Sequence, residues 1–125
     1  MATDSDAVWS AVTGIYAAFL AGGRTAIDAR ISPDATMWDA FHEPLIRGRD
    51  ELDAVRDARP ADGGQPADLR AHDPVIDVFG DVALVRHLLT VVYPDGREQR
   101  LRNTGVWRRS DDGWLCVHNH EDLLP

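Results

Sequence analysis

The chain has 125 residues, a formal net charge of −8, and arginine but no lysine among its basic residues. This length suits one compact domain spanning residues 1–125. The acidic charge disfavours nucleic acid and anionic membranes as partners, and the missing lysine excludes a lysine Schiff base. The acidic start MATDSDAVWS has no signal-peptide character, and no apolar run could span a membrane, so we expect a cytoplasmic protein.

The first half of the chain predicts helices and short strands. A first helix begins near Asp4 or Ser5 and ends at Gly22-Gly23. Tyr16 lies on its apolar face with Val8, Val12, Ile15 and Phe19, where it either packs in the core or extends its hydroxyl into a cavity. The pattern then predicts, in order, a helix over 25–31, strands over 35–41 and in EPLIRG, a helix over 49–59, and a loop over 60–68 that is a candidate lid.

The second half is rich in strands joined by short turns. Residues 69–79, 82–93 and the two arms of a hairpin over 97–120 predict a meander, hence an α+β fold with helices packed on an antiparallel sheet. The strands are apolar on both faces, because Val106 alternates with Trp107 and Leu115 with Trp114 and Cys116. Helices can cover only one face, so the other face predicts a homodimer.

The hairpin sets the expected site. If Arg109 pairs with Trp114 across Ser110–Gly113, then Gly105 lies opposite His118 and Asn103 opposite His120. Alternation then places both histidines on one face with Asn103, Trp107, Trp114 and Cys116.

The closing segment VWRRSDDGWLCVHNH resembles the pattern V-W-x(6)-W-x(2)-V-H-x-H, which closes many members of the nuclear transport factor 2-like superfamily. SnoaL-like proteins and the calcium/calmodulin-dependent kinase II association domains belong to this group. The segments GDVALVRHLLTVVYPDG and DATMWDAFHEPLIRGRDEL carry the resemblance across most of the chain. It implies a cone in which a curved antiparallel sheet wraps three N-terminal helices around a deep pocket, and dimers formed through the outer sheet face.

The resemblance also implies a departure at Gly105. The association domains carry pocket arginines in the strand matching Arg86 and at the position of Gly105, where this chain has glycine. That change removes a charge and leaves room for a ligand, so the ligand class of those relatives is not transferred.

The candidate site combines several strands. If Val92 pairs with Arg97, Arg86 lies opposite Asn103 and joins the face of His118 and His120, whereas His87 points away as an interface or surface residue. Further residues expected at the pocket are Tyr16, Trp38, Asp39, His42, Gly105 and Trp107.

This constellation suits acid–base chemistry. A neutral histidine can move a proton, with Asp39 as a further candidate catalytic residue, while Arg86 stabilises a developing enolate. The alternatives are structural histidines, an ion pair of Arg86 with Asp39, Asp73 or Glu121, and a metal site that adds His42, His72 or Asp39 to the two histidines. Cys116 is expected to be a buried residue rather than a nucleophile.

We therefore predict a small-molecule pocket protein that acts without a cofactor or metal on a carbonyl-bearing substrate, as an isomerase, cyclase or dehydratase. The alternative is a non-catalytic ligand-binding or oligomerisation domain like the kinase association domains.

Overall fold

The computed structural model describes residues 3–59 and 65–125. In chain order the elements are α1 (Asp4–Leu20), α2 (Arg24–Asp28), β1 (Ile31–Asp39), β2 (His42–Arg47), α3 (Gly48–Ala58), β3 (Asp68–Phe79), β4 (Val82–Val92), β5 (Glu98–Ser110) and β6 (Gly113–Leu123). The predicted order of helices followed by long strands is confirmed. Residues 60–64 of the loop considered as a lid lie outside the described residues.

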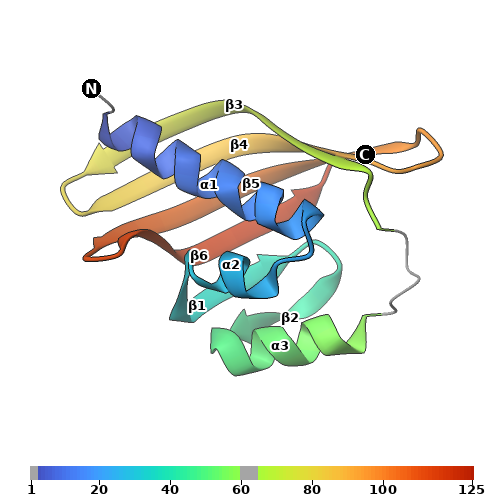
Figure 1. Cartoon of the computed structure of the whole chain (residues 1–125), viewed down its shortest axis with the longest axis horizontal. Helices are drawn as coiled ribbons and strands as arrows, with labels where there is room; N and C mark the ends of the chain where they lie inside the picture. Colours follow the sequence, from blue (N-terminus) through green and yellow to red (C-terminus); the bar gives the residue numbers. More distant parts are fainter. Residues whose placement is uncertain (1–2, 60–64) are drawn as a thin grey trace.

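One curved sheet holds all six strands in the order β2-β1-β6-β5-β4-β3 (Figure 1). Each of β3, β4 and β5 pairs antiparallel with the next strand, which confirms the meander. However, β1 runs parallel to β6. The sheet is therefore mixed, and the expectation of a purely antiparallel sheet is wrong at this pair.

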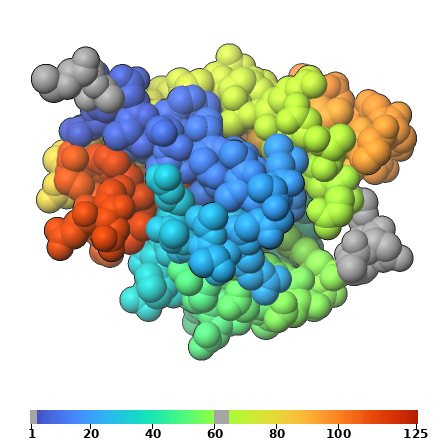
Figure 2. All heavy atoms as spheres, in the orientation of Figure 1, coloured from blue at the N-terminus to red at the C-terminus, as the bar shows by residue number. Residues whose placement is uncertain are grey.

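The inner face of the sheet is covered by α1, which crosses it diagonally, while α3 packs at the end formed by β1 and β2 (Figure 1). Val8, Ala11 and Val12 of α1 are buried against Val85 of β4 and Trp107 of β5. Burial of each such valine stabilises the fold by about 1.5 kcal/mol or more. In the space-filling view α1 and α2 occupy the middle of this face, so β5 and β6 are hidden except at the margins (Figure 2).

The ends of α1 differ slightly from expectation. Its cap is Thr3, whose hydroxyl accepts from the Asp6 amide at 3.1 Å while the Asp6 carboxylate accepts from the Thr3 amide at 3.2 Å. This reciprocal capping box explains why the helix already includes Asp4 and Ser5. Phe19, expected on the buried face, is 45% exposed.

The strand β1 begins earlier than the sequence predicts. The second helix ends at Asp28, and β1 starts at Ile31 rather than at residue 35. Its pairing with β6 is irregular between Ile31 and Thr36. Pro33 lies in this gap, where its missing N–H breaks no ladder hydrogen bond.

The pairing of β4 with β5 differs by one residue from the prediction. The turn at 94–96 is a three-residue loop in which Gly96 has φ 88°, and Tyr93 donates its N–H to the carbonyl of Arg97 at 2.9 Å. Val92 therefore pairs with Glu98, not Arg97. Since side chains alternate, this single step turns Arg86 to the outer face and His87 to the inner face.

A β-bulge changes the second half of the closing hairpin. Arg109 pairs with Trp114 as predicted, and Trp107 with Cys116. The register then shifts, so that Val117 is an extra residue and Val106 pairs with His118. The predicted pairs Gly105–His118 and Asn103–His120 are therefore wrong, since Gly105 pairs with Asn119 and Asn103 with Glu121.

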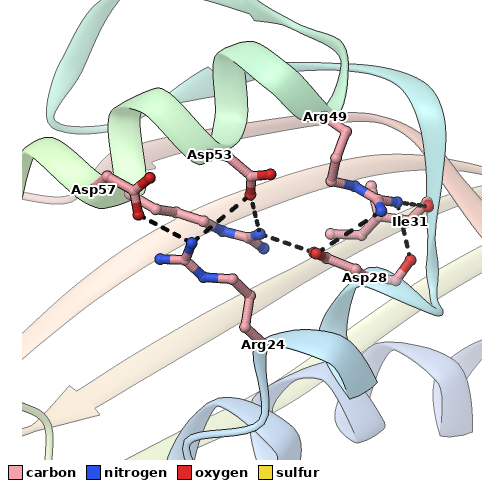
Figure 3. A network of polar contacts seen from close by, with 7 residues as sticks. Arg24, Asp28, Ile31, Arg49, Asp53 and Asp57 are labelled. Atoms are coloured by element: carbon pink, nitrogen blue, oxygen red, sulfur yellow. Dashed lines mark hydrogen bonds and ion pairs between the residues drawn. The ribbon is translucent and has the colours of Figure 1, made fainter.

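An ion-pair network joins α2 to α3 (Figure 3). Asp28, with an 18% exposed side chain, binds Arg56 at 2.8 Å and lies 3.8 Å from Arg49. Arg49 also donates to the carbonyl oxygens of Asp28 at 3.1 Å and Ile31 at 2.7 Å. The network thus holds α3 against the start of β1.

Candidate functional site

A row of polar side chains crosses the otherwise apolar inner face of the sheet. His87 of β4 pairs with Asn103 of β5, and Asn103 pairs with Glu121 of β6. His87 and Asn103 are each 5% exposed. Buried polar groups are costly unless they are hydrogen-bonded, so a buried polar row inside a core is a candidate functional site.

Tyr16 of α1 joins this row from above. Its hydroxyl lies 2.8 Å from Nε2 of His87, and the two rings meet edge to face. Burial, and secondarily the charge of His72, lowers the pKa of His87 to about 4. Burial also raises the pKa of Tyr16, with further contributions from Glu121 and Cys116. Both groups are therefore neutral near pH 7.

The neutral His87 ring fixes which hydrogen bonds are available. Its Nδ1 is buried and has no hydrogen-bond partner among the described residues. Buried donors without a partner are rarer than buried acceptors without one. This favours the tautomer in which Nε2–H donates to the Tyr16 oxygen, and it leaves the Tyr16 O–H free to donate elsewhere.

Glu121 is the ionisable group of the row that titrates near neutrality. The amide of Asn103 donates to its Oε2 at 3.2 Å. Burial, followed by the charge of Asp39, raises the pKa of Glu121 to about 7, against the lowering effects of the Asn103 hydrogen bond and the Arg59 charge. A carboxyl group with this pKa can both accept and donate a proton at neutral pH.

These side chains line a cavity of about 160 Å³ between α1 and the sheet. Its polar residues are Tyr16, His87, Asn103, Asn119 and Glu121, and apolar side chains such as Met37 and Trp107 form the rest of the wall. Within the described part of the chain, no arginine lines it. The cavity is smaller than the roughly 300–1,000 Å³ that drug-sized ligands occupy, so it suits a small, uncharged molecule.

Gly105 lies beside two of the cavity residues, Trp107 and Asn119, and it does not open the free space that the sequence suggested. A Cβ atom there would lie 3.0 Å from Nε1 of Trp107 and 3.3 Å from Oδ1 of Asn119. Glycine is thus needed because these two polar atoms occupy the space beside its Cα. A larger residue would displace them.

An open groove of about 550 Å³ lies beside the inner cavity, at the turn between β1 and β2. Trp38, Asp39, His42 and His120 line it, and Glu121 lines both the groove and the cavity. The structure therefore brings together four of the predicted site residues, but at the rim rather than inside. Asp39 forms an ion pair with Arg59 at 2.8 Å.

The two histidines and Arg86 do not meet, because the two registers differ from prediction. Arg86 is on the outer face and forms an ion pair with Asp77, which was not among its predicted partners. Nδ1 of His118 lies 2.7 Å from the Thr36 hydroxyl, and His120 lies beside the Trp38 ring. Of the residues predicted for the site, only Tyr16, Asn103 and Trp107 line the inner cavity. Glu121 lines it with them.

The two remaining candidates are the Cys116 thiol and the metal site. Cys116 is 4% exposed, and burial raises the pKa of its thiol to about 12, which fits the expected buried residue. Within residues 3–59 and 65–125, no three histidine, cysteine, aspartate or glutamate side chains are arranged to hold a metal ion.

Three residues of the cavity, His87, Asn119 and Glu121, are not among those predicted from the sequence. A signal for His87 was present, because Ala83, Val85, Leu89 and Val91 share its alternating face and are all apolar. The opposite face of that strand is also apolar apart from Arg86 and Thr90, so only the register decides between them. For Asn119 and Glu121 no signal was available, because a bulge at Val117 has no sequence marker.

Comparisons with known proteins agree with this architecture. The profile of the SnoaL-like domain family matches residues 8–122. The chain belongs to this family. The CaMKII hub of S. rosetta is a similar solved structure, with a TM-score of 0.82, 27% identity, and 99% of each chain covered. No curated protein matches the sequence.

Two further structures are similar to this SnoaL-like domain. A putative calcium/calmodulin-dependent protein kinase II association domain from Xanthomonas campestris has a TM-score of 0.79 and 16% identity, covering 99% of this chain and 90% of its own. An NTF2-like protein from Cytophaga hutchinsonii has a TM-score of 0.80 and 10% identity, covering 98% and 100%. The fold is thus the predicted α+β cone of NTF2-like proteins.

None of the helices described in this SnoaL-like domain is both long and apolar enough to cross a membrane.

Proposed function

We propose that this SnoaL-like domain is a cofactor-independent enzyme that moves a proton next to a carbonyl group, with Glu121 as its acid–base group. The observation that carries the proposal is the Glu121 carboxyl in the inner cavity, with Oε2 held by Asn103 at 3.2 Å and a pKa near 7. This group replaces His118 and His120, which face away from the cavity, in the role that the sequence suggested.

The surrounding groups support this chemistry. The Glu121 carboxylate would remove a proton from the carbon beside the carbonyl, and the carbonyl oxygen would become an enolate oxygen. The free O–H of Tyr16 would donate a hydrogen bond to that oxygen, held in place by Nε2 of His87 at 2.8 Å. The protonated Glu121 would then return the proton to another carbon, which gives an isomer, or to a departing hydroxyl, which gives a dehydration.

The substrate should be small and uncharged. A carboxylate ligand would meet the negative charge of Glu121, and the described cavity wall supplies no arginine to balance it. Anionic ligands are therefore disfavoured by like-charge repulsion.

A hydrogen-exchange assay tests the proposal without knowledge of the product. The protein is incubated in D₂O with cyclopentanone, cyclohex-2-enone or 4-hydroxybutan-2-one, and loss of the proton signals beside the carbonyl is followed by NMR. We expect exchange above the buffer rate that rises with pH through about 7, where Glu121 ionises. Glu121→Gln should lower the rate by about 10²-fold or more.

The matched control is Asp122→Asn. Asp122 is the next residue along β6, but it pairs with Arg102 on the outer face and should be dispensable. Equal exchange by wild type and Glu121→Gln, or exchange by neither with any probe, would contradict the enzymatic proposal.

A second function, oligomerisation, is favoured by the outer sheet face. Val75, Phe79 and Val82 point outward from β3 and β4 and are 56%, 65% and 39% exposed. The similarity to the CaMKII hub of S. rosetta also supports association of copies. We infer a homodimer formed through this face, which is compatible with a pocket on the opposite face.

A further inference from the structure

The polar row on the inner face continues beyond Glu121 to a second carboxyl group. Trp38 of β1 pairs with His120 of β6 in parallel register, so Asp39 follows beside Glu121. Asp39 shares its strand face with Met37, which lines the inner cavity, and both carboxyl groups line the open groove. The row therefore runs from His87 through Asn103 and Glu121 to Asp39.

Asp39 is held at both of its oxygens. Its Oδ1 accepts from the Phe41 N–H at 2.8 Å, and its Oδ2 lies 2.8 Å from Nη2 of Arg59. The Asp39 side chain is 21% exposed and that of Arg59 is 49% exposed. A fixed negative charge thus lies next to Glu121, with a fixed positive charge at the end of α3 behind it.

Few other charges act on Glu121 inside the cone. The groups that face it are Tyr16 from α1, His87 from β4 and Asn103 from β5, and all three are neutral near pH 7. The open groove that Glu121 also lines adds His42 and Glu43 of β2 and the β6 neighbours His120 and Asp122. Among the surrounding groups, Asp39 and Arg59 are the charges that shift the ionisation of Glu121.

We propose that Asp39 and Arg59 form a charge pair that sets the proton affinity of Glu121, and with it the pH range in which the site works. The consequence for activity rests on the proposed role of Glu121, whereas the effect on its ionisation does not. Asp39 disfavours the Glu121 carboxylate and Arg59 favours it, and the influence of Asp39 is the larger of the two. Neither residue touches the reacting atoms, and both act through Glu121.

The pair makes two predictions of opposite sign. Asp39→Asn removes the repelling charge, and should lower the titration midpoint of Glu121 by roughly one pKa unit. Arg59→Gln removes the attracting charge, and should raise the midpoint by a smaller amount, because Arg59 is half-exposed. Arg59→Lys keeps the charge and should restore the wild-type midpoint. The double variant Asp39→Asn/Arg59→Gln should have a midpoint between those of the two single variants.

The measurement is the NMR titration of protein carrying ¹³C-labelled glutamate carboxyl groups, with the Glu121 signal assigned by its loss in Glu121→Gln. Midpoints that move in opposite directions, with rescue by Arg59→Lys, support the pair. Midpoints that do not move, or that move the same way in both variants, overturn it. Arg59 is half-exposed and its replacement leaves the core intact, so its shift alone decides the question if Asp39→Asn fails to fold.

The exchange assay separates this proposal from the enzymatic one. If the midpoints move as expected and the activity profile moves with them, both proposals stand. If the midpoints move but no variant or wild type exchanges any probe, the charge pair stands and the proposed enzymatic function fails.

Discussion

At the scale of single residues, Glu121 couples function to stability. The inner cavity holds a carboxyl group whose ionised form is disfavoured by burial, which raises its pKa from 4.5 to about 7. Each unit of such a difference corresponds to about 1.4 kcal/mol between the two protonation states. A group that is useful as an acid–base catalyst at neutral pH must therefore weaken the folded state there.

This coupling predicts how stability depends on pH. Below about pH 4.5 Glu121 is protonated in both the folded and unfolded chains, and its stabilising contribution to the free energy of unfolding is fully present. As pH rises from there to about 7 the unfolded chain ionises first, so the stabilisation is lost. Glu121→Gln should be more stable than wild type by roughly 3 kcal/mol at pH 8 and nearly equal to it at pH 4.

Urea unfolding at pH 4 and pH 8 measures the two differences. Asp122→Asn serves again as the control, because its carboxylate lies on the outer face beside Arg102. A Glu121→Gln variant that is equally stable or less stable at pH 8 would contradict a strained carboxylate in the cavity.

At the scale of elements, the position of α3 depends on Asp28. This carboxylate binds Arg56 at 2.8 Å and lies near Arg49, and both arginine side chains are mostly buried, at 17% and 27% exposed. Arg49 in turn donates to the carbonyl of Ile31 at the start of β1. Since Arg59 directly follows α3, the same contacts help to place the cation opposite Asp39.

We predict that Asp28→Asn lowers the free energy of unfolding by about 1–2 kcal/mol, because the partly buried Arg49 then keeps only carbonyl oxygens as partners and Arg56 keeps only Asp53, at 3.1 Å. The comparison variant is Asp57→Asn, which removes a 3.0 Å ion pair with Arg24 whose side chains are 50% and 69% exposed. Its cost should be below about 1 kcal/mol. Equal losses in urea titrations of the two variants would show that the network does not fasten α3.

At the scale of the whole molecule, the two faces of the sheet carry different chemistry. The inner face has the cavity and its polar row, whereas the outer face combines apolar side chains with arginine–aspartate pairs such as Arg86–Asp77 and Arg102–Asp122. Exposed apolar patches bordered by charges are typical of protein interfaces. The fold thus places the proposed ligand site and the proposed association surface on opposite faces of the sheet.

The proposed dimer predicts the effect of one charge on the outer face. Val75→Asp places a carboxylate in the apolar patch and should weaken dimerisation at least tenfold, because that charge would have to lose its hydration. Phe19→Asp changes a similarly exposed apolar residue, 45% exposed on α1, and should leave association unchanged. Analytical ultracentrifugation decides between the outcomes, and a wild-type protein that is monomeric at micromolar concentration would contradict the dimer.

Much of the fold could be predicted from sequence, because it depends on patterns that span many residues. The helical spacing of α1, the turns between strands and the alternation along the meander each repeat a signal several times. The resemblance carried by VWRRSDDGWLCVHNH identified the cone, and the Arg109–Trp114 pair of its hairpin is confirmed.

The site was less predictable, because it depends on which of two neighbouring residues in a strand faces the cavity. A turn with three residues instead of four exchanges Arg86 for His87 on the inner face, and one bulged residue exchanges His118 and His120 for Asn119 and Glu121. Both faces of these strands contain apolar residues, so hydrophobic patterning did not choose between the registers. Trp107 and Asn103 are predicted inside correctly because the hairpin register holds from Arg109–Trp114 to Trp107–Cys116, and Tyr16 because α1 has one clearly apolar face.

The bulge at Val117 has a consequence for how this site could change during evolution. It lies between the structural half of β6, with Trp114 and Cys116, and the half that lines the cavity with Asn119 and Glu121. The strand therefore encodes two alternative cavity walls, one with an amide and a carboxyl group and one with the imidazoles of His118 and His120. Pairing of the same strand without the bulge would exchange one wall for the other, whereas deletion of Val117 would keep Asn119 and Glu121 facing the cavity. A change that straightens the bulge, rather than a substitution in the wall, is therefore the shortest route from this site to a different one.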